Sequence, residues 1–170
     1  MTLDELNRLP VGEARVVLAR CCGSEAWVER MVAERPFLDT AHLLGLAHDV
    51  WMKLTPAAWR EAFTHHPRIG DLASLKRRFA ATADLAGREQ AGVAGASQAT
   101  LEALAEGNRA YQEKFGYIFI IFASGRSADE MLALLRQRMS NDPETELTTA
   151  ANEQGKIMRL RLDQLLEDAR

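Results

Sequence analysis

The amino-acid sequence predicts an all-α protein: a single-domain bundle of roughly eight helices over residues 1–170, with one buried extended apolar segment. Three observations support this prediction. Apolar side chains recur at the three- and four-residue spacing of amphipathic helices in successive stretches. Capping residues, prolines and glycines separate those stretches, as they do at helix ends. Residues 117–123 form a continuously apolar run like a buried strand, but no second β-rich run exists to pair with it.

Five helices are predicted before residue 66, and each is bounded by local signals. Side chains suited to N-caps precede four of them, and proline ends or begins three of them. The predicted helices begin after Thr2, run from Val11 to Arg20, run from Ser24 to before Pro36, begin after Asp39, and run from Thr55 through Phe63.

Further helices and one long loop are predicted after residue 71. In order, these are a helix over 72–81, a loop over 82–96, a helix from Ser97 to about Phe115, the apolar segment 117–123, a helix from Ser127 to Ser140, and a helix from the Asn141-Asp142-Pro143 cap to about Glu167. Loops as long as 82–96 are uncommon in compact domains unless they have a function. This loop contains Glu89 and Gln90, which makes it a candidate for the site.

The apolar segment 117–123 has two interpretations. Its backbone groups cannot all be paired in a sheet, so they are available to a ligand if the segment is extended or irregular. Alternatively, the segment is an apolar connection that fills the core between two helices. The sequence leaves both interpretations open.

Composition and charge indicate an ordinary soluble globule. Of the 170 residues, 47% are hydrophobic and 26% are charged, and the net charge of −3 provides no basic excess for nucleic acid. The two cysteines, Cys21 and Cys22, are adjacent and ill-suited to a disulfide, which indicates a reducing compartment. No apolar run approaches the roughly 18 residues of a membrane span. The acidic N-terminus is unlike a signal peptide, and the C-terminus is unlike a peroxisomal signal, so we expect a cytoplasmic protein.

The stretch from His65 to Asp71 concentrates ionisable side chains between two predicted helices. Pro67 fixes its own φ and disfavours helical geometry at His66, so the preceding helix should stop by about His65. A titratable side chain on such a corner suits acid–base catalysis, because imidazole titrates near neutral pH. The alternative is a turn in which proline, Gly70 and the capping Asp71 have only their usual structural roles.

Arg161 is a second candidate, because it falls on the apolar face of the last helix. It lies four residues from both Ile157 and Leu165, whereas Arg159 shares the polar face with Gly155. An inward guanidinium needs an anion, for which the candidates are Glu89, Asp71 or a substrate carboxylate. The alternative is an arginine at the edge of the stripe that extends to water.

Cofactor-free acid–base chemistry is the enzymatic interpretation that these residues favour. His42 and His48 are six residues apart and fall on different helix faces, and no paired Cys-x-x-Cys is present, so we predict no metal site. No glycine-rich nucleotide-binding motif is present. A helical protein–protein interaction module that docks through residues 117–123 is kept as the alternative, and the histidine spacing disfavours a metal-dependent hydrolase.

Several motifs of this chain resemble those of the OHCU decarboxylases, which act on 2-oxo-4-hydroxy-4-carboxy-5-ureidoimidazoline (OHCU) in the conversion of uric acid to allantoin. The motifs are His66-Pro67-Arg68-Ile69-Gly70-Asp71, Glu89-Gln90-Ala91-Gly92, the run from Lys114 to Ile121, Arg138-Met139-Ser140-Asn141-Asp142, Glu153-Gln154, and the run from Lys156 to Leu162. They occur in the family's order and span nearly the whole chain.

The resemblance implies a carboxy-lyase that produces (S)-allantoin without a metal or organic cofactor, and a homodimer. It implies His66 and Glu89 as catalytic residues. The substrate-binding residues that it implies are Pro67, Gln90, Arg161 and the backbone of Phe119, Ile120, Ile121, Phe122 and Ala123. In one respect the chain departs from the family: Ala86 and Gly87 stand where a serine is usual, so no hydroxyl contact is expected there.

Overall fold

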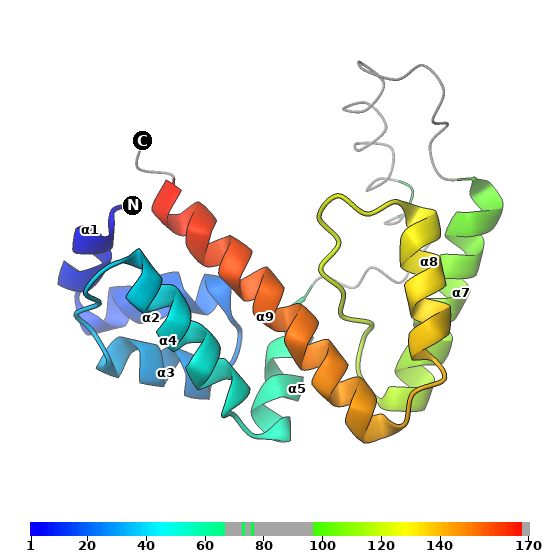
Figure 1. Cartoon of the computed structure of the whole chain (residues 1–170), viewed down its shortest axis with the longest axis horizontal. Coiled ribbons are helices and arrows are strands. Elements are labelled where there is room, and N and C mark those ends of the chain that lie inside the picture. Colours follow the sequence, from blue (N-terminus) through cyan, green and yellow to red (C-terminus); the bar gives the residue numbers. More distant parts are fainter. Residues whose placement is uncertain (67–72, 74–75, 77–96, 168–170) are drawn as a thin grey trace, which may run out of the picture. The chain divides into compact units, whose positions relative to one another are not determined.

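The structure, a computed structural model, describes residues 1–66, 73, 76 and 97–167 (Figure 1). All regular elements in this part of the chain are helices, so the all-α prediction is confirmed. The eight helices are α1 (Leu3–Arg8), α2 (Val11–Cys21), α3 (Glu25–Ala33), α4 (Thr40–Met52), α5 (Pro56–Thr64), α7 (Gln98–Phe115), α8 (Ala128–Arg138) and α9 (Pro143–Glu167).

The helices begin where the capping residues predict. The side chains of six N-cap residues each accept a hydrogen bond from a backbone N–H of the first turn: Thr2, Ser24, Asp39, Thr55, Ser97 and Ser127. Gly116 ends α7 with a φ of 79°, a left-handed conformation that favours glycine. The predicted helix 72–81 lies outside the described residues except for Ala73 and Lys76, which are helical, and the predicted loop 82–96 lies wholly outside them.

The chain divides into two compact units. The first unit comprises Met1–His66 and Leu147–Arg170, and the second comprises Pro67–Glu146. The division falls within α9, whose first turn belongs to the second unit. The single domain over residues 1–170 therefore stays a prediction, and each unit is described by itself.

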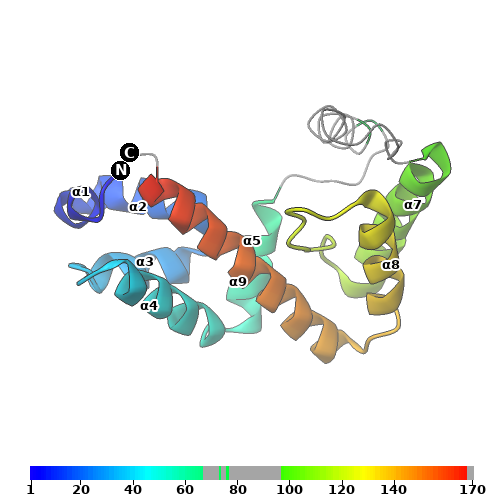
Figure 2. The same ribbon diagram turned by 45° about the horizontal axis from the view of Figure 1, so that its top comes forward.

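Two buried tryptophans, Trp27 and Trp51, lie in the core of the first unit, and the partly buried Trp59 packs against Trp51. The indole N–H of Trp27 donates to the Ala47 carbonyl over 3.0 Å, and that of Trp51 donates to the Ala151 carbonyl over 2.8 Å. Trp59 donates to the Trp51 carbonyl over 2.9 Å. Because each indole N–H is paired, the large side chains of Trp27 and Trp51 are buried without leaving a donor unsatisfied. The bond from Trp51 to Ala151 also joins α4 to α9 (Figure 2).

The buried face of α9 largely follows the predicted stripe. Leu147, Ala150, Ala151, Met158 and Leu162 are buried, whereas Ile157 and Leu165 are only partly so. One assignment was wrong: Gly155, which we placed on the polar face, is buried. A Cβ added at Gly155 would lie 3.4 Å from Cδ1 of Trp51, so the glycine backbone is covered by this ring.

The second unit packs α7 against α8 around an apolar cluster. Its buried members are Leu101, Leu104, Ala128, Met131, Leu132 and Leu135. Between the two helices, residues 117–123 follow an irregular path in which Tyr117 and Ile120 are buried. The irregular path that we predicted is therefore present, but only these two residues are buried and the other five are partly buried.

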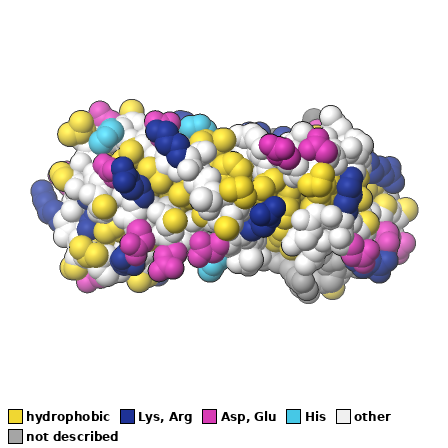
Figure 3. All heavy atoms as spheres, turned by 90° about the horizontal axis from the view of Figure 1, so that it is seen from below, with side chains coloured by type: hydrophobic (Ala, Val, Ile, Leu, Met, Phe, Trp, Pro, Cys, Tyr) yellow, Lys and Arg dark blue, Asp and Glu magenta, His cyan; other side chains and the backbone are white. Residues whose placement is uncertain are grey.

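One face of the molecule carries side chains of both charges. Figure 3 shows one face, on which acidic and basic side chains are interspersed among apolar ones.

Among the described helices, none combines the length and the apolar character needed to cross a bilayer.

Candidate active site

His66 lies in the turn that follows α5. Helix α5 ends at Thr64, His65 is its C-cap, and the His66 N–H donates to the Phe63 carbonyl over 3.3 Å. The predicted end of this helix is therefore confirmed. Gly23 leaves space for the turn, because a Cβ there would lie 2.5 Å from Cγ of His65.

The imidazole of His66 makes a hydrogen bond to a side chain of α9. Its Nε2 faces Oε1 of Gln154, and Gln154 is completely buried. Burial lowers the pKa of His66 below its ordinary value of 6.5; the hydrogen bond to Gln154 opposes this shift, whereas the charges of Arg161 and His65 add to it. His66 is therefore neutral at neutral pH and can accept a proton.

Arg161 follows Gln154 by seven residues, about two turns of α9, and so lies on the same face. It is partly buried, whereas Arg159 is exposed, as the helical phase predicts. Its Nη1 lies 3.4 Å from the Arg20 carbonyl oxygen and 3.5 Å from that of Cys21, where α2 ends. These oxygens carry the partial negative charge of a helix C-terminus.

Among the described residues, no carboxylate lies within ion-pair distance of Arg161. The anion that we expected for it is therefore not in this part of the chain. Two candidate partners, Asp71 and Glu89, lie outside the described residues, as do Pro67 and Gln90 and the serine-replacing positions Ala86 and Gly87.

The cysteines beside Arg161 are not nucleophiles. Burial raises the pKa of Cys21 to about 11 and that of Cys22 to about 12, although the charge of Arg161 opposes both shifts. Both side chains are therefore thiols at neutral pH, and only the thiolate is reactive. In the described part of the chain, no group of three His, Cys, Asp or Glu side chains is arranged to hold a metal ion.

The predicted substrate-binding residues Phe119–Ala123 belong to the second unit, where a buried arginine fixes their path. Nη1 of Arg138 donates to the Ile120 carbonyl over 2.7 Å, and its guanidinium carbon lies 4.6 Å from the centroid of the Phe119 ring. Further along, Nε of Arg126 donates to the Phe122 carbonyl over 3.0 Å. The Phe119 ring therefore packs against the Arg138 guanidinium, and the Ile120 carbonyl is held by the same side chain.

The charge of Arg138 is balanced by Glu146. The two form a buried ion pair with an N–O distance of 2.5 Å, and the Tyr111 hydroxyl donates to the same carboxylate. Asn141 Nδ2 donates to its other oxygen over 2.8 Å. Burial, together with the bond to Glu146, raises the pKa of Tyr111, so this hydroxyl stays a donor. Sequence reasoning noticed Arg138 only as part of a family motif. Its ion pair with Glu146, eight residues away, had no signal in the hydropathy pattern.

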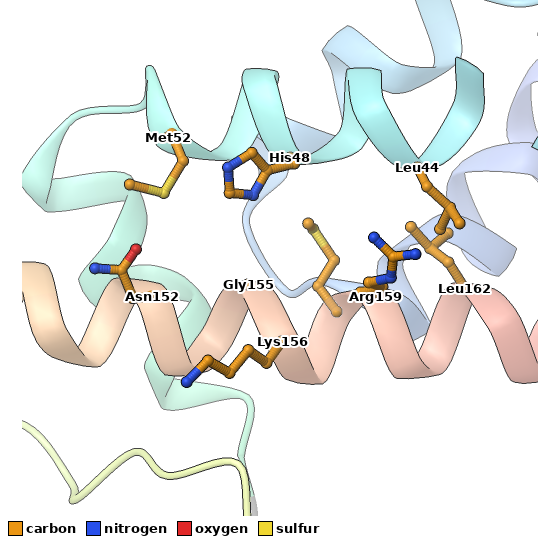
Figure 4. A pocket seen from close by; sticks show the side chains of 9 residues that line it. Leu44, His48, Met52, Asn152, Gly155, Lys156, Arg159 and Leu162 are labelled. Atoms are coloured by element: carbon orange, nitrogen blue, oxygen red, sulfur yellow. The ribbon is translucent and has the colours of Figure 1, made fainter. Parts of the chain in front are cut away.

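A separate cavity of about 400 Å³ lies between α4 and α9 (Figure 4). Its lining includes His48 and Met52 from α4, and Asn152 and Arg159 from α9. None of the predicted site residues lines it. His66 faces Gln154, whereas Gly155 and Arg159 of the same helix line the cavity.

Comparison with known proteins gives a consistent result. The OHCU decarboxylase family model matches residues 7–163. The chain is 38% identical over 149 residues to the uric acid degradation bifunctional protein TTL of Arabidopsis thaliana, covering 87% of this chain but only 46% of that protein. It is 32% identical over 136 residues to the 2-oxo-4-hydroxy-4-carboxy-5-ureidoimidazoline decarboxylase of Amia calva, covering 78% of this chain and 75% of that protein.

Among solved structures, a crystal structure of OHCU decarboxylase in the presence of (S)-allantoin is similar, with a TM-score of 0.72 and 38% sequence identity. The match covers 88% of this chain and 96% of that one. The resemblance carried by the sequence motifs is thereby confirmed, and the chain belongs to the OHCU decarboxylase family.

Proposed function

We propose that this chain is a carboxy-lyase that converts OHCU to (S)-allantoin in the breakdown of uric acid, without a metal or organic cofactor. The observation that carries the proposal is His66, which is held neutral by burial beside Gln154 at the position of the family's catalytic histidine. Membership of the family and the names of the relatives support the choice of substrate.

The substrate supplies its own electron sink. The bond from C4 to the carboxylate breaks, and its electron pair forms a C4=C5 double bond while the C5=N electrons move to nitrogen, which takes a proton. Carbon dioxide leaves. The 4-hydroxyl then loses its proton as the C4 carbonyl forms, and C5 gains a proton on one face. His66 moves the proton of the 4-hydroxyl, and Glu89 orients or shares in the transfer.

The other predicted residues bind the substrate. Arg161 holds carbonyl oxygens of the ring or of the ureido group, where negative charge develops in the transition state. Its partial burial on the face of α9 that carries Gln154 supports this role. Pro67, Gln90 and the backbone of residues 119–123 complete the binding groups, and Arg138 keeps that backbone in place.

We propose further that the protein is a homodimer and acts in the cytoplasm. The family resemblance motivates the dimer, and the two free thiols suit a reducing compartment. Sedimentation equilibrium of the purified chain is expected to give twice the mass of 18.9 kDa. A single species at the monomer mass would contradict the dimer.

The reaction is tested by measuring carbon dioxide release from freshly generated OHCU with enzyme dialysed against a chelator. We expect release many-fold faster than in buffer, in step with allantoin formation, and a preparation without stoichiometric metal. Release no faster than in buffer would overturn the decarboxylase. Release that is lost on chelation and restored by a divalent metal would overturn the cofactor-free mechanism.

A further inference from the structure

Gln154 is a buried polar residue to which the proposed reaction has assigned no role. It is fully buried on α9, and its Oε1 faces Nε2 of His66. Its amide Nε2 has no hydrogen-bond partner among the described residues. A buried amide donor without a partner costs free energy, so such groups are rare and usually have a reason.

The hydrogen bond defines the protonation of the imidazole. An amide oxygen can only accept, so His66 Nε2 must carry the proton. A neutral imidazole has one N–H, which leaves the lone pair on Nδ1. The neutral histidine therefore accepts a proton at Nδ1. Its imidazole ring cannot flip without breaking the hydrogen bond to Gln154.

We propose that Gln154 is a positioning residue that fixes His66 in the Nε2–H tautomer with Nδ1 as the base, and that its own free amide N–H donates to an oxygen of the bound substrate. The inference rests on the proposed function for the identity of the substrate. The tautomer rests on the geometry alone. The unpaired amide N–H of Gln154 lies on the side chain that binds His66, and an oxygen of the bound substrate would accept its hydrogen bond.

The charged groups around His66 make the proposal testable by pH. Among the described residues these are His65 on the same turn and Arg161 on α9, and both disfavour the imidazolium. The bond to Gln154 favours it. Substitutions at position 154 should therefore move the titration of His66 in opposite directions: a carboxylate should raise its pKa, and an apolar side chain should lower it.

The first experiment is ¹⁵N NMR of the histidine side chains in the purified chain without substrate. The Nε2–H tautomer is expected for His66 near neutral pH, with loss of this preference in Gln154→Leu. Observation of the Nδ1–H tautomer in the wild type would overturn the inference. Because no substrate is used, this result does not depend on whether the protein decarboxylates OHCU. The wild-type spectrum identifies the tautomer of His66 even if Gln154→Leu does not fold.

The second experiment compares pH profiles of kcat/KM for OHCU. Gln154→Glu should move the acidic limb to higher pH and Gln154→Leu should move it to lower pH. Both should raise KM by about tenfold, the scale of one lost hydrogen bond. Gln164→Glu and Gln164→Leu are matched controls, because Gln164 is exposed on the same helix. If folded Gln154 variants keep the wild-type KM and the acidic limb of their kcat/KM profiles does not shift, Gln154 has only a structural role and the proposal is wrong.

Discussion

At the scale of the residue, His66 and Glu89 are the groups that should move protons. We expect His66→Ala and Glu89→Ala each to reduce kcat by about 10²–10⁴-fold, the usual contribution of a positioned acid or base. The fold should survive His66→Ala, because His66 lies beyond the end of α5. If the two act as a unit, the double variant should be little worse than the worse single variant. Multiplicative losses would indicate independent roles, and full turnover by His66→Ala would remove the mechanism.

The pH dependence follows from the environment of His66. Its pKa is lowered below 6.5, chiefly by burial, so the neutral base persists below the pH at which a free histidine protonates. We expect kcat/KM to stay level as pH falls from 7 and to decline only below the lowered pKa. Between that pKa and 6.5, the unfolded chain binds more protons than the folded one, so stability also decreases as pH falls. An acidic limb above 6.5 in the measured profile would contradict this environment.

Arg161 and Arg159 form a matched pair on one helix. Arg161→Lys should lower kcat, because lysine cannot reproduce the planar two-pronged donor that binds carbonyl oxygens in the transition state. Arg159→Lys should have almost no effect, because this side chain is 69% exposed and pairs loosely with Asp163 at 3.9 Å. Steady-state kinetics with OHCU decide. A raised KM with kcat kept in Arg161→Lys would assign it to the substrate carboxylate instead, and equal damage from both would show that neither has the proposed role.

At the scale of the element, the segment 117–123 depends on the buried ion pair of Arg138 and Glu146. Removing one partner leaves the other charge buried without compensation, so Arg138→Met should lower the free energy of unfolding by about 3–5 kcal/mol. Arg109→Met is the control, because its pair with Glu106 is 68% and 62% exposed, and it should cost less than about 1 kcal/mol. Chemical denaturation provides the measurement. Similar losses in both variants would show that Arg138 is not a special anchor.

The elements also show which features a sequence can predict. Helix starts were predictable because the capping contact is local: the side chains of Thr2 and Ser127 accept hydrogen bonds from N–H groups only three residues on. The hydrogen bond of His66 to Gln154 could not be predicted from the sequence, because it joins residues that are 88 positions apart. For Arg161, helical phase predicted the inward face, but its carbonyl partner at Cys21 lies 140 residues away. Gly155 was misplaced because a hydropathy pattern does not report a backbone covered by Trp51.

At the scale of the whole molecule, the question is whether this chain alone carries the decarboxylase. The Arabidopsis relative is called bifunctional, and the chain spans 46% of its length. The Amia calva decarboxylase is matched over 75% of its length. The family match supports the proposal of a single activity, the decarboxylation of OHCU, and this proposal is the central claim.

That claim is tested most directly by circular dichroism of allantoin formed from freshly generated OHCU, with wild type and His66→Ala measured side by side. The wild type should produce the signal of (S)-allantoin far faster than buffer, because protonation in a closed site gives one enantiomer. His66→Ala should approach the buffer rate. A wild-type trace that does not differ from buffer would contradict the decarboxylase, and rapid formation of racemic allantoin would contradict protonation on one face.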